Sequence, residues 1–211
     1  MWASLDVKWQ ESFALAWDAF RRGNVPVGCV IINEDEEIIA KGQNAIFEPS
    51  FNSPLAGTDL AHAEMVALSQ LPKAKHPAIR DYTLYTTLEP CPMCFGAMVM
   101  MGIRQIKYAA RDGIAGSVAL KTATPYLTSK RMKTEMADPM LEVFQTALTT
   151  AFELRRKHPR QEELLSLLRA DSPSGVELGL RLYEQDYFAR AVQLDYNVQK
   201  VFQRAMQSLM A

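Results

Sequence analysis

The chain has 211 residues and a formal net charge of −1, with 48% hydrophobic and 22% charged residues. This composition is typical of a globular protein with one sizeable core. The near-zero net charge excludes proteins that bind nucleic acid through an overall excess of positive charge. No apolar run approaches the roughly 20 residues that span a bilayer, and residues 1–10 lack the pattern of a secretory signal. The three cysteines do not suggest a disulfide framework. We therefore expect a cytoplasmic protein without a membrane partner.

The first half of the chain predicts a helix followed by a hairpin. Apolar side chains recur at helical spacing over residues 9–22. Residues 27–32 and 37–42 are predicted strands, and the polar turn between them joins them as a hairpin. Residues 44–59 contain several prolines and polar residues and are predicted to form a loop.

Helices and strands then alternate. The sequence predicts short helices at residues 61–71 and 91–101, and strands at residues 81–88 and 103–110. This order favours a layered α/β domain.

The rest of the chain is predicted to be helical. A helix is expected at residues 136–157, and the last fifty residues favour three more, at residues 161–169, 175–187 and 189–210. We expect one domain over residues 1–158 and a helical extension over residues 159–211. An apolar stripe on the last segment suggests that the extension packs on the core or on a partner subunit.

Two short segments carry the residues best suited to chemistry. His62 and Glu64 begin one predicted helix, while Cys91 and Cys94 begin another directly after a strand. Cysteines three positions apart share one helix face, and the positive end of the helix dipole favours thiolates. Two thiolates and an imidazole suit zinc, and a catalytic zinc keeps its fourth position for water. The remaining Cys29 is expected to be a small buried residue, so three ligands with an open position fit better than a structural zinc.

Glu64 lies two residues after His62, where its carboxylate can reach a metal-bound water without binding the metal. Zinc lowers the pKa of bound water from about 15.7 to about 7, and a nearby carboxylate can move the proton. These residues suit a hydrolytic reaction. A hydrolytic deamination needs both events, because hydroxide adds to the carbon that bears an amino group, a ring nitrogen is protonated and ammonia leaves. A zinc-containing binding module without catalysis is the alternative, and the presence of Glu64 argues against it.

Together these motifs resemble the cytidine and deoxycytidylate deaminase superfamily of zinc-dependent nucleoside and nucleobase deaminases. The branch that holds tRNA adenosine deaminases and guanine deaminases is the most similar. The resemblance covers residues 9–157 and is strongest at residues 25–28, Asn44, residues 62–64 and residues 87–97. It implies a three-layer α/β/α fold, with a mixed five-stranded sheet flanked by helices and the C-terminal helices as an extra extension. The zinc deaminase domain would then be residues 1–158.

The resemblance also implies the roles of the central residues. His62, Cys91 and Cys94 would bind one zinc ion per subunit, and Glu64 would be the catalytic proton shuttle. Many members of the superfamily form homodimers or larger assemblies, so we expect a homodimer or a larger homo-oligomer.

Four further residues are expected to contact the substrate. The resemblance implies that Asn44 hydrogen-bonds the base and that Gly28 lets the backbone approach the ring closely. Val27 and Glu89, which belong to the same matching stretches, are expected beside them. A simpler interpretation of Asn44, as only a turn residue after the second strand, stays open.

Two substrate classes remain open. One is a small molecule, meaning a free base, nucleoside or nucleotide, and the other is adenosine in a tRNA anticodon loop. Residues 25–28, residues 111–117 and the basic helix end at Arg155 favour tRNA. The tRNA enzymes usually carry Asp-Pro-Thr-Ala before the zinc-binding histidine, whereas residues 58–61 here are Thr-Asp-Leu-Ala. This departure and the near-neutral charge favour a small molecule.

Overall fold

The computed structural model describes residues 2–210. Helix α1 (Val7–Arg21) is close to the predicted helix. Its N-cap residue is Asp6, whose carboxylate accepts a hydrogen bond from the Lys8 backbone N–H at 3.0 Å. Such a side chain satisfies one of the N–H groups that have no partner at a helix start. Among the described residues, no helix combines the length and apolar character needed to cross a bilayer.

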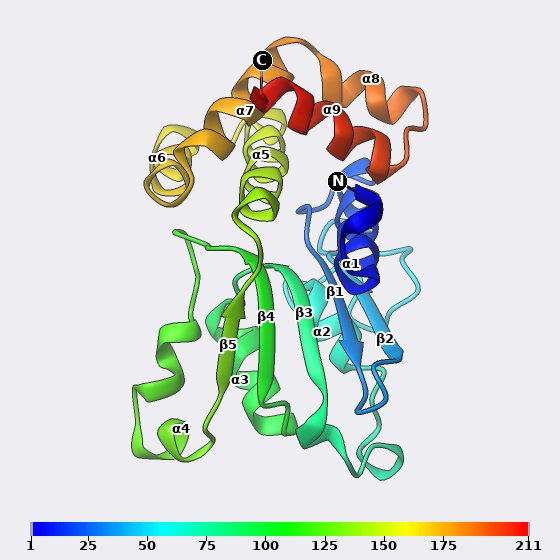
Figure 1. The fold of residues 1–211 in the computed structure, drawn as a ribbon, viewed down its shortest axis with the longest axis vertical. Helices are drawn as coiled ribbons and strands as arrows, with labels where there is room; N and C mark the ends of the chain where they lie inside the picture. The colour runs from blue at the N-terminus through cyan, green and yellow to red at the C-terminus, as the bar shows by residue number, and fades with distance from the viewer. Residues whose placement is uncertain (1, 211) are drawn as a thin grey trace.

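The centre of the fold is a five-stranded sheet (Figure 1). Its strands lie in the order β2 (Ile38–Gln43), β1 (Gly28–Ile32), β3 (Thr83–Leu88), β4 (Gln105–Ala110) and β5 (Lys133–Met136). Strand β1 is antiparallel to both of its neighbours, and β3, β4 and β5 are parallel. The mixed five-stranded sheet is therefore confirmed.

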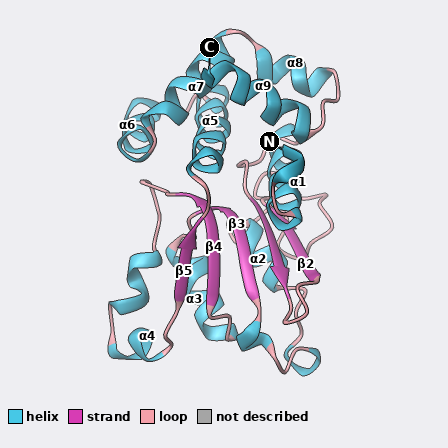
Figure 2. Cartoon of the chain, in the orientation of Figure 1, coloured by secondary structure: helices cyan, strands magenta, loops and turns pink. Residues whose placement is uncertain are grey.

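Helices cover both faces of the sheet (Figure 2). Alternate strand residues point to opposite faces, so that Val30 packs with α1 and α5 (Pro139–Arg156) while Ile31 packs with α2 (Ala63–Leu68) and α3 (Pro92–Met101). Each face buries its own hydrophobic cluster. The three-layer α/β/α architecture expected from the sequence is confirmed.

Strand β5 was not expected from its own residues and was implied only by the family resemblance. It follows the short helix α4 (Pro125–Ser129) and pairs with β4 alone, with Thr134 opposite Ile106. Its residues alternate between exposed and half-buried positions. A polar edge strand carries little of the hydrophobic alternation by which strands are predicted.

The C-terminal extension contains four helices among the described residues, α6 (Gln161–Asp171), α7 (Pro173–Glu184), α8 (Tyr187–Gln193) and α9 (Val198–Met210). The prediction of one helix over residues 189–210 was wrong in one respect, because this segment divides between α8 and α9. Asp195 between them has a φ of 52° and thus a left-handed conformation, which ends a right-handed helix.

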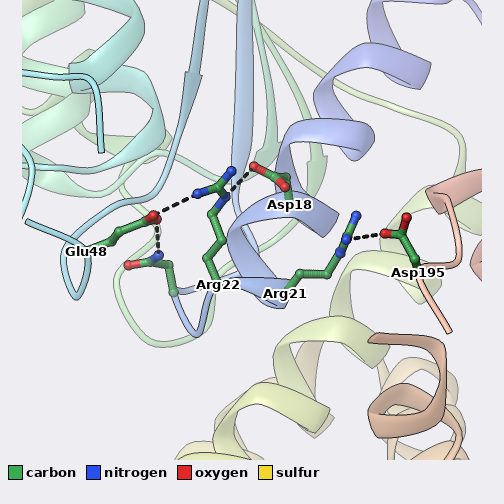
Figure 3. Close-up of polar contacts among 6 residues, drawn as sticks. Asp18, Arg21, Arg22, Glu48 and Asp195 are labelled. Atoms are coloured by element: carbon green, nitrogen blue, oxygen red, sulfur yellow. Dashed lines mark hydrogen bonds and ion pairs between the residues drawn. The ribbon is translucent and has the colours of Figure 1, made fainter. Parts of the chain in front are cut away.

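The extension shares one hydrophobic core with α1 and α5. The ring of Phe202 on α9 is centred 5.2 Å from that of Trp2 and 5.0 Å from that of Phe144 on α5. An ion pair between Arg21 and Asp195 joins the end of α1 to the turn between α8 and α9 (Figure 3). These contacts place the extension over the α1–α5 layer, and we expect it to add to the stability of the whole fold.

Phe202→Ala should therefore lower the free energy of unfolding by about 3–5 kcal/mol, because Phe202 is 0% exposed and its loss leaves a cavity between three segments. Urea denaturation followed by circular dichroism measures the change. The control Leu194→Ala removes a side chain that is 60% exposed and should change stability by no more than about 0.5 kcal/mol. A Phe202 variant as stable as this control would contradict the shared core.

Candidate active site

Helices α2 and α3 start close together, and each start holds a predicted metal ligand. His62 is the N-cap residue of α2 and Cys91 is the N-cap residue of α3, both with extended backbone. Pro92 follows as the first residue of α3, a position that needs no backbone N–H donor. Cys94 lies in the first turn of α3. The positive ends of two helix dipoles thus point to one place, which favours anionic sulfur ligands.

The three predicted ligands converge. The Nδ1 atom of His62 lies 3.5 Å from the Cys91 sulfur and 3.6 Å from the Cys94 sulfur. In a tetrahedral zinc site with ordinary Zn–S and Zn–N bond lengths, such atoms are about 3.5 Å apart. Across residues 2–210, these three residues are the only group of His, Cys, Asp and Glu side chains that could hold a metal ion. The donor set therefore fits a zinc ion with one position open.

The protonation of the cysteines agrees with a cation site. Hydrogen bonding with Cys94, and then with His62, lowers the pKa of the Cys91 thiol to about 4. The bond to Cys91, followed by burial, raises the pKa of Cys94. The two sulfurs thus share one negative charge when only protons compensate it. A bound divalent cation allows both to ionise, because coordinated thiols are deprotonated.

Glu64 lies beside this group in the first turn of α2 and is only 4% exposed. The Thr86 hydroxyl on β3 donates a hydrogen bond to its Oε1 atom at 2.9 Å, and the Cys94 thiol donates to its Oε2 atom at 3.4 Å. Burial raises the pKa of the Glu64 carboxyl above its ordinary value. A carboxyl group with a raised pKa is suited to accepting and returning a proton near neutral pH.

A cavity of about 120 Å³ opens next to these residues. Six residues expected at the site line it: Val27, Asn44, His62, Glu64, Glu89 and Cys91. Sequence reasoning did not assign a role to other lining residues, among them Val25, Leu88, Asp112 and Ala115. Asp112 follows β4 as Glu89 follows the parallel β3. The carboxyl ends of parallel strands meet at one edge of a sheet, which is the signal that could have identified Asp112.

Asn44 and Gly28 differ in their placement. The Asn44 side-chain oxygen accepts a hydrogen bond from the Ile46 N–H at 3.3 Å, while its amide nitrogen has no partner among the described residues. The side-chain oxygen of Asn44 thus stabilises the turn after β2, while its amide nitrogen remains available as a donor. Gly28 lies outside the cavity lining, and a Cβ there would lie 2.0 Å from the Ser12 carbonyl oxygen. The close approach that requires this glycine is that of helix α1.

Glu89 holds the loop that follows β4. Its Oε1 atom accepts a hydrogen bond from the Val118 N–H at 3.0 Å, and Oε2 accepts one from the Asp112 N–H at 3.4 Å. A Cβ on Gly116 would lie 2.6 Å from the same carboxylate, so only glycine lets the loop wrap so closely. The Glu89 carboxylate thereby fixes residues 112–118 as one wall of the cavity.

Arg111 connects this wall to the C-terminal helices. Its guanidinium donates two hydrogen bonds to the buried Glu142 carboxylate on α5, at 2.7 and 3.1 Å. It also donates to the carbonyl oxygen of Asp171, the last residue of α6. A bidentate arginine–carboxylate pair is geometrically specific. The extension therefore helps to position the loop next to the cavity.

The loop over residues 44–61, of which Asn44 lines the cavity, is held by residues at the end of α1 (Figure 3). Arg22 pairs with Glu48 at 2.8 Å and with Asp18 at 2.8 Å. The Asn24 amide donates to Glu48 at 3.3 Å, and the Phe47 N–H donates to Asn24 at 2.9 Å. Ion pairs and hydrogen bonds from neighbouring segments thus hold both the loop over residues 44–61 and residues 112–118, and each of these segments contributes to the cavity lining.

Cys91→Ser should abolish stoichiometric zinc binding and lower stability, because metal binding and folding are coupled. Metal content after purification in zinc, measured by inductively coupled plasma mass spectrometry, tests this. Cys29→Ala is the matched control, since Cys29 is buried and lies outside the ligand group. Full zinc content in the Cys91 variant, or its loss in the Cys29 variant, would contradict the assignment.

Arg111→Met should loosen residues 112–118 by removing their connection to α5 and α6. Hydrogen–deuterium exchange of the peptide that covers this loop should become about tenfold faster, which corresponds to about 1.4 kcal/mol of lost protection. The control Arg169→Met removes an exposed ion pair with Glu177. Exchange in the loop that is equally slow in both variants would show that Arg111 does not position it.

The chain matches the family described as the cytidine and deoxycytidylate deaminase zinc-binding region over residues 7–110. It is 33% identical over 162 residues to a tRNA-specific adenosine deaminase of Bacillus subtilis, an alignment that covers 74% of this chain and 94% of that protein. These matches include the segments that hold His62, Glu64, Cys91 and Cys94.

Other similarities are more local. The chain is 40% identical over 109 residues to a tRNA(Ile)-lysidine synthase of Deinococcus radiodurans, which covers 51% of this chain and 18% of that protein. It spans less than two thirds of the length of several curated relatives. A solved tRNA:A34 deaminase that performs A-to-I editing at the wobble position shares the fold, with a TM-score of 0.51, 25% identity, and coverage of 62% of this chain and 97% of that one. The chain belongs to the zinc-binding family of cytidine and deoxycytidylate deaminases.

Proposed function

We propose that the protein is a hydrolytic deaminase that replaces an exocyclic amino group of a nucleobase with oxygen and releases ammonia. The observation that carries this proposal is the convergence of His62, Cys91 and Cys94 beside the buried Glu64 at one cavity. A purely structural metal site has no use for a carboxylate held next to its ligands. A binding module without catalysis has none either.

His62, Cys91 and Cys94 would hold the zinc ion, which when bound supplies a water molecule that is acidic enough to react near neutral pH. The Oε1 atom of Glu64 already accepts a hydrogen bond from the Thr86 hydroxyl. The Oε2 atom, which faces the metal ligands, would therefore carry the proton. Glu64 would take one proton from the water and deliver it to a ring nitrogen, and it would then carry the second proton of the same water to the departing amine. The water oxygen then stays on the ring carbon and the amine leaves as ammonia.

The remaining residues would orient the base. The unpartnered amide nitrogen of Asn44 is a donor for a ring nitrogen or carbonyl oxygen. Val25 and Val27 supply an apolar wall for one face of the ring. Glu89 would act through the backbone of residues 112–118, because both of its carboxylate oxygens already accept hydrogen bonds from that loop.

We infer that the substrate is a free base or a nucleoside. Three carboxylate residues, Glu64, Glu89 and Asp112, line the cavity, and none of the described lining residues is lysine or arginine. Such a lining repels phosphate groups. Nearby arginines are also engaged: Arg22 pairs with Asp18 and Glu48, and Arg111 pairs with Glu142.

A second candidate is deamination of adenosine in tRNA. It is favoured by the 33% identity to the Bacillus subtilis tRNA-specific adenosine deaminase along 94% of that protein. Against it, Arg155 in the basic helix end donates to the Phe20 carbonyl oxygen at 2.9 Å and lies over the Phe20 ring. This arginine joins α5 to α1, so it is not a free contact for phosphate.

An ammonia-release assay on the zinc-loaded protein separates the two substrate classes. Its panel contains free bases, nucleosides, nucleotides and anticodon stem-loops. We expect turnover of an amino-bearing base or nucleoside, with the 5′-phosphorylated form turned over more slowly. Turnover of anticodon stem-loops alone would overturn the small-molecule assignment, and no ammonia from any substrate would overturn the deaminase.

Glu64→Ala should keep its zinc and lose activity by a factor on the order of 10²–10⁴, because a positioned acid–base group contributes that much. Metal analysis and ammonia release are measured on the same sample. Glu37→Ala is the control for removing a carboxylate, since Glu37 lies in the hairpin turn away from the cavity. Full activity in the Glu64 variant would contradict its role as proton carrier.

A further inference from the structure

A second and larger cavity lies at the other end of helix α3. Its volume is about 740 Å³, within the range of small-molecule sites. The 3-10 helices η2 (Lys73–Lys75) and η3 (Ile79–Asp81), the last turn of α3 and helix α4 contribute its walls. Because Cys91 is the N-cap residue of α3 and Met101 is its last residue, this cavity is about 15 Å from the metal ligands along the helix axis.

The cavity is lined by four basic side chains and by no acidic one. Lys73, Arg80, Arg104 and Lys130 belong to four different segments of the chain. Within residues 2–210, none of the four forms an ion pair with a carboxylate, although nine other lysines and arginines do. The chain has 24 acidic and 23 basic residues, so an overall excess of positive charge does not explain this concentration.

The dipole of helix α3 explains the position of only one of these four basic residues. Arg104 donates hydrogen bonds to the carbonyl oxygens of Val99 and Ile103 at 3.1 and 2.9 Å, as suits a cation at the end of α3. Burial and then repulsion from Arg80 lower the pKa of Arg104. Like charges gathered without counterions destabilise a fold. They are typical of a site that binds an anion.

The same cavity has an aromatic and apolar side. Tyr126 on α4 is half exposed, and its hydroxyl donates to the Met100 sulfur at 3.4 Å. Met100 is itself 73% exposed, although a large apolar side chain is ordinarily covered. Lys130 lies 4.1 Å from the centre of the Tyr126 ring. A flat ring beside unpaired cations can receive an aromatic group that carries phosphate.

We propose that this cavity binds a mononucleotide, with the phosphates on Lys73, Arg80, Arg104 and Lys130 and the base against Tyr126 and Met100. The cations converge on a hollow of small-molecule size, whereas a nucleic acid strand needs an extended basic surface. The site is separate from the deaminase cavity, whose carboxylates disfavour phosphate. It does not depend on the proposed function.

Isothermal titration of the zinc-loaded protein with uridine triphosphate tests the proposal. This probe has no exocyclic amine and therefore is not consumed. We expect one saturable site per chain. Arg80→Ala and Lys130→Ala should each weaken binding about tenfold or more, because each removes a charge-assisted contact. Uridine without phosphate should not bind to the cavity, and inorganic triphosphate should bind more weakly than the nucleotide.

Lys200→Ala is the matched control, because Lys200 also lies over a tyrosine ring, that of Tyr196, but far from the cavity lining. It should bind uridine triphosphate as the unaltered protein does. The side chains of Arg80 and Lys130 donate no hydrogen bond to another described residue, so both variants should fold, which thermal denaturation checks. The proposal would be overturned if uridine triphosphate did not bind, or if Lys200→Ala weakened its binding as much as the other two substitutions. It would also be overturned if only an RNA hairpin bound, or if light scattering showed a dimer in which a second copy of the chain covers the cavity.

Discussion

The site depends on the meeting of two helix starts. His62 and Cys91 are both N-cap residues, so their extended backbones aim the imidazole and the thiol at one point while the helix dipoles favour negative charge there. Strand β3 positions both helix starts. Thr86 on this strand donates a hydrogen bond to Glu64 in the first turn of α2, and the chain that leaves the strand continues into α3. Moving either helix start by one residue would turn the ligands away from each other.

Helix α3 separates two cavities of opposite charge. At its first residues the cavity is lined by the carboxylates of Glu64, Glu89 and Asp112. At its last residues the lining includes Arg80 and Arg104 but no carboxylate. Since like charges repel and the two linings differ in sign, the same phosphorylated compound would be disfavoured at one end and attracted at the other. The contrast limits the ligand chemistry at each end of the helix.

The C-terminal extension contributes to more than the stability of the core. Its aromatic side chains join those of α1 and α5 in one cluster, and Asp171 at the end of α6 receives a hydrogen bond from Arg111. Arg111 directly precedes the loop that Glu89 holds. The family match covers residues 7–110, so this contact comes from a part of the chain outside it. It connects a region without motifs to the wall of the cavity.

The sequence alone was sufficient to predict the order of the elements, which is a helix, a hairpin and then alternating helices and strands, and the layered architecture that follows from it. It also predicted the metal ligands. Periodicity and the spacing of His62, Cys91 and Cys94 can both be recognised along the chain itself. It did not reveal β5, whose sequence shows no alternation of apolar and polar residues, or the break between α8 and α9 at Asp195. Nor could it indicate that Gly28 contacts α1, that Asp112 lines the cavity, or that four cations from separate segments surround a second one. These features arise where segments distant in the chain pack together, and side-chain contacts of that kind are set by the tertiary fold and not by neighbours in sequence.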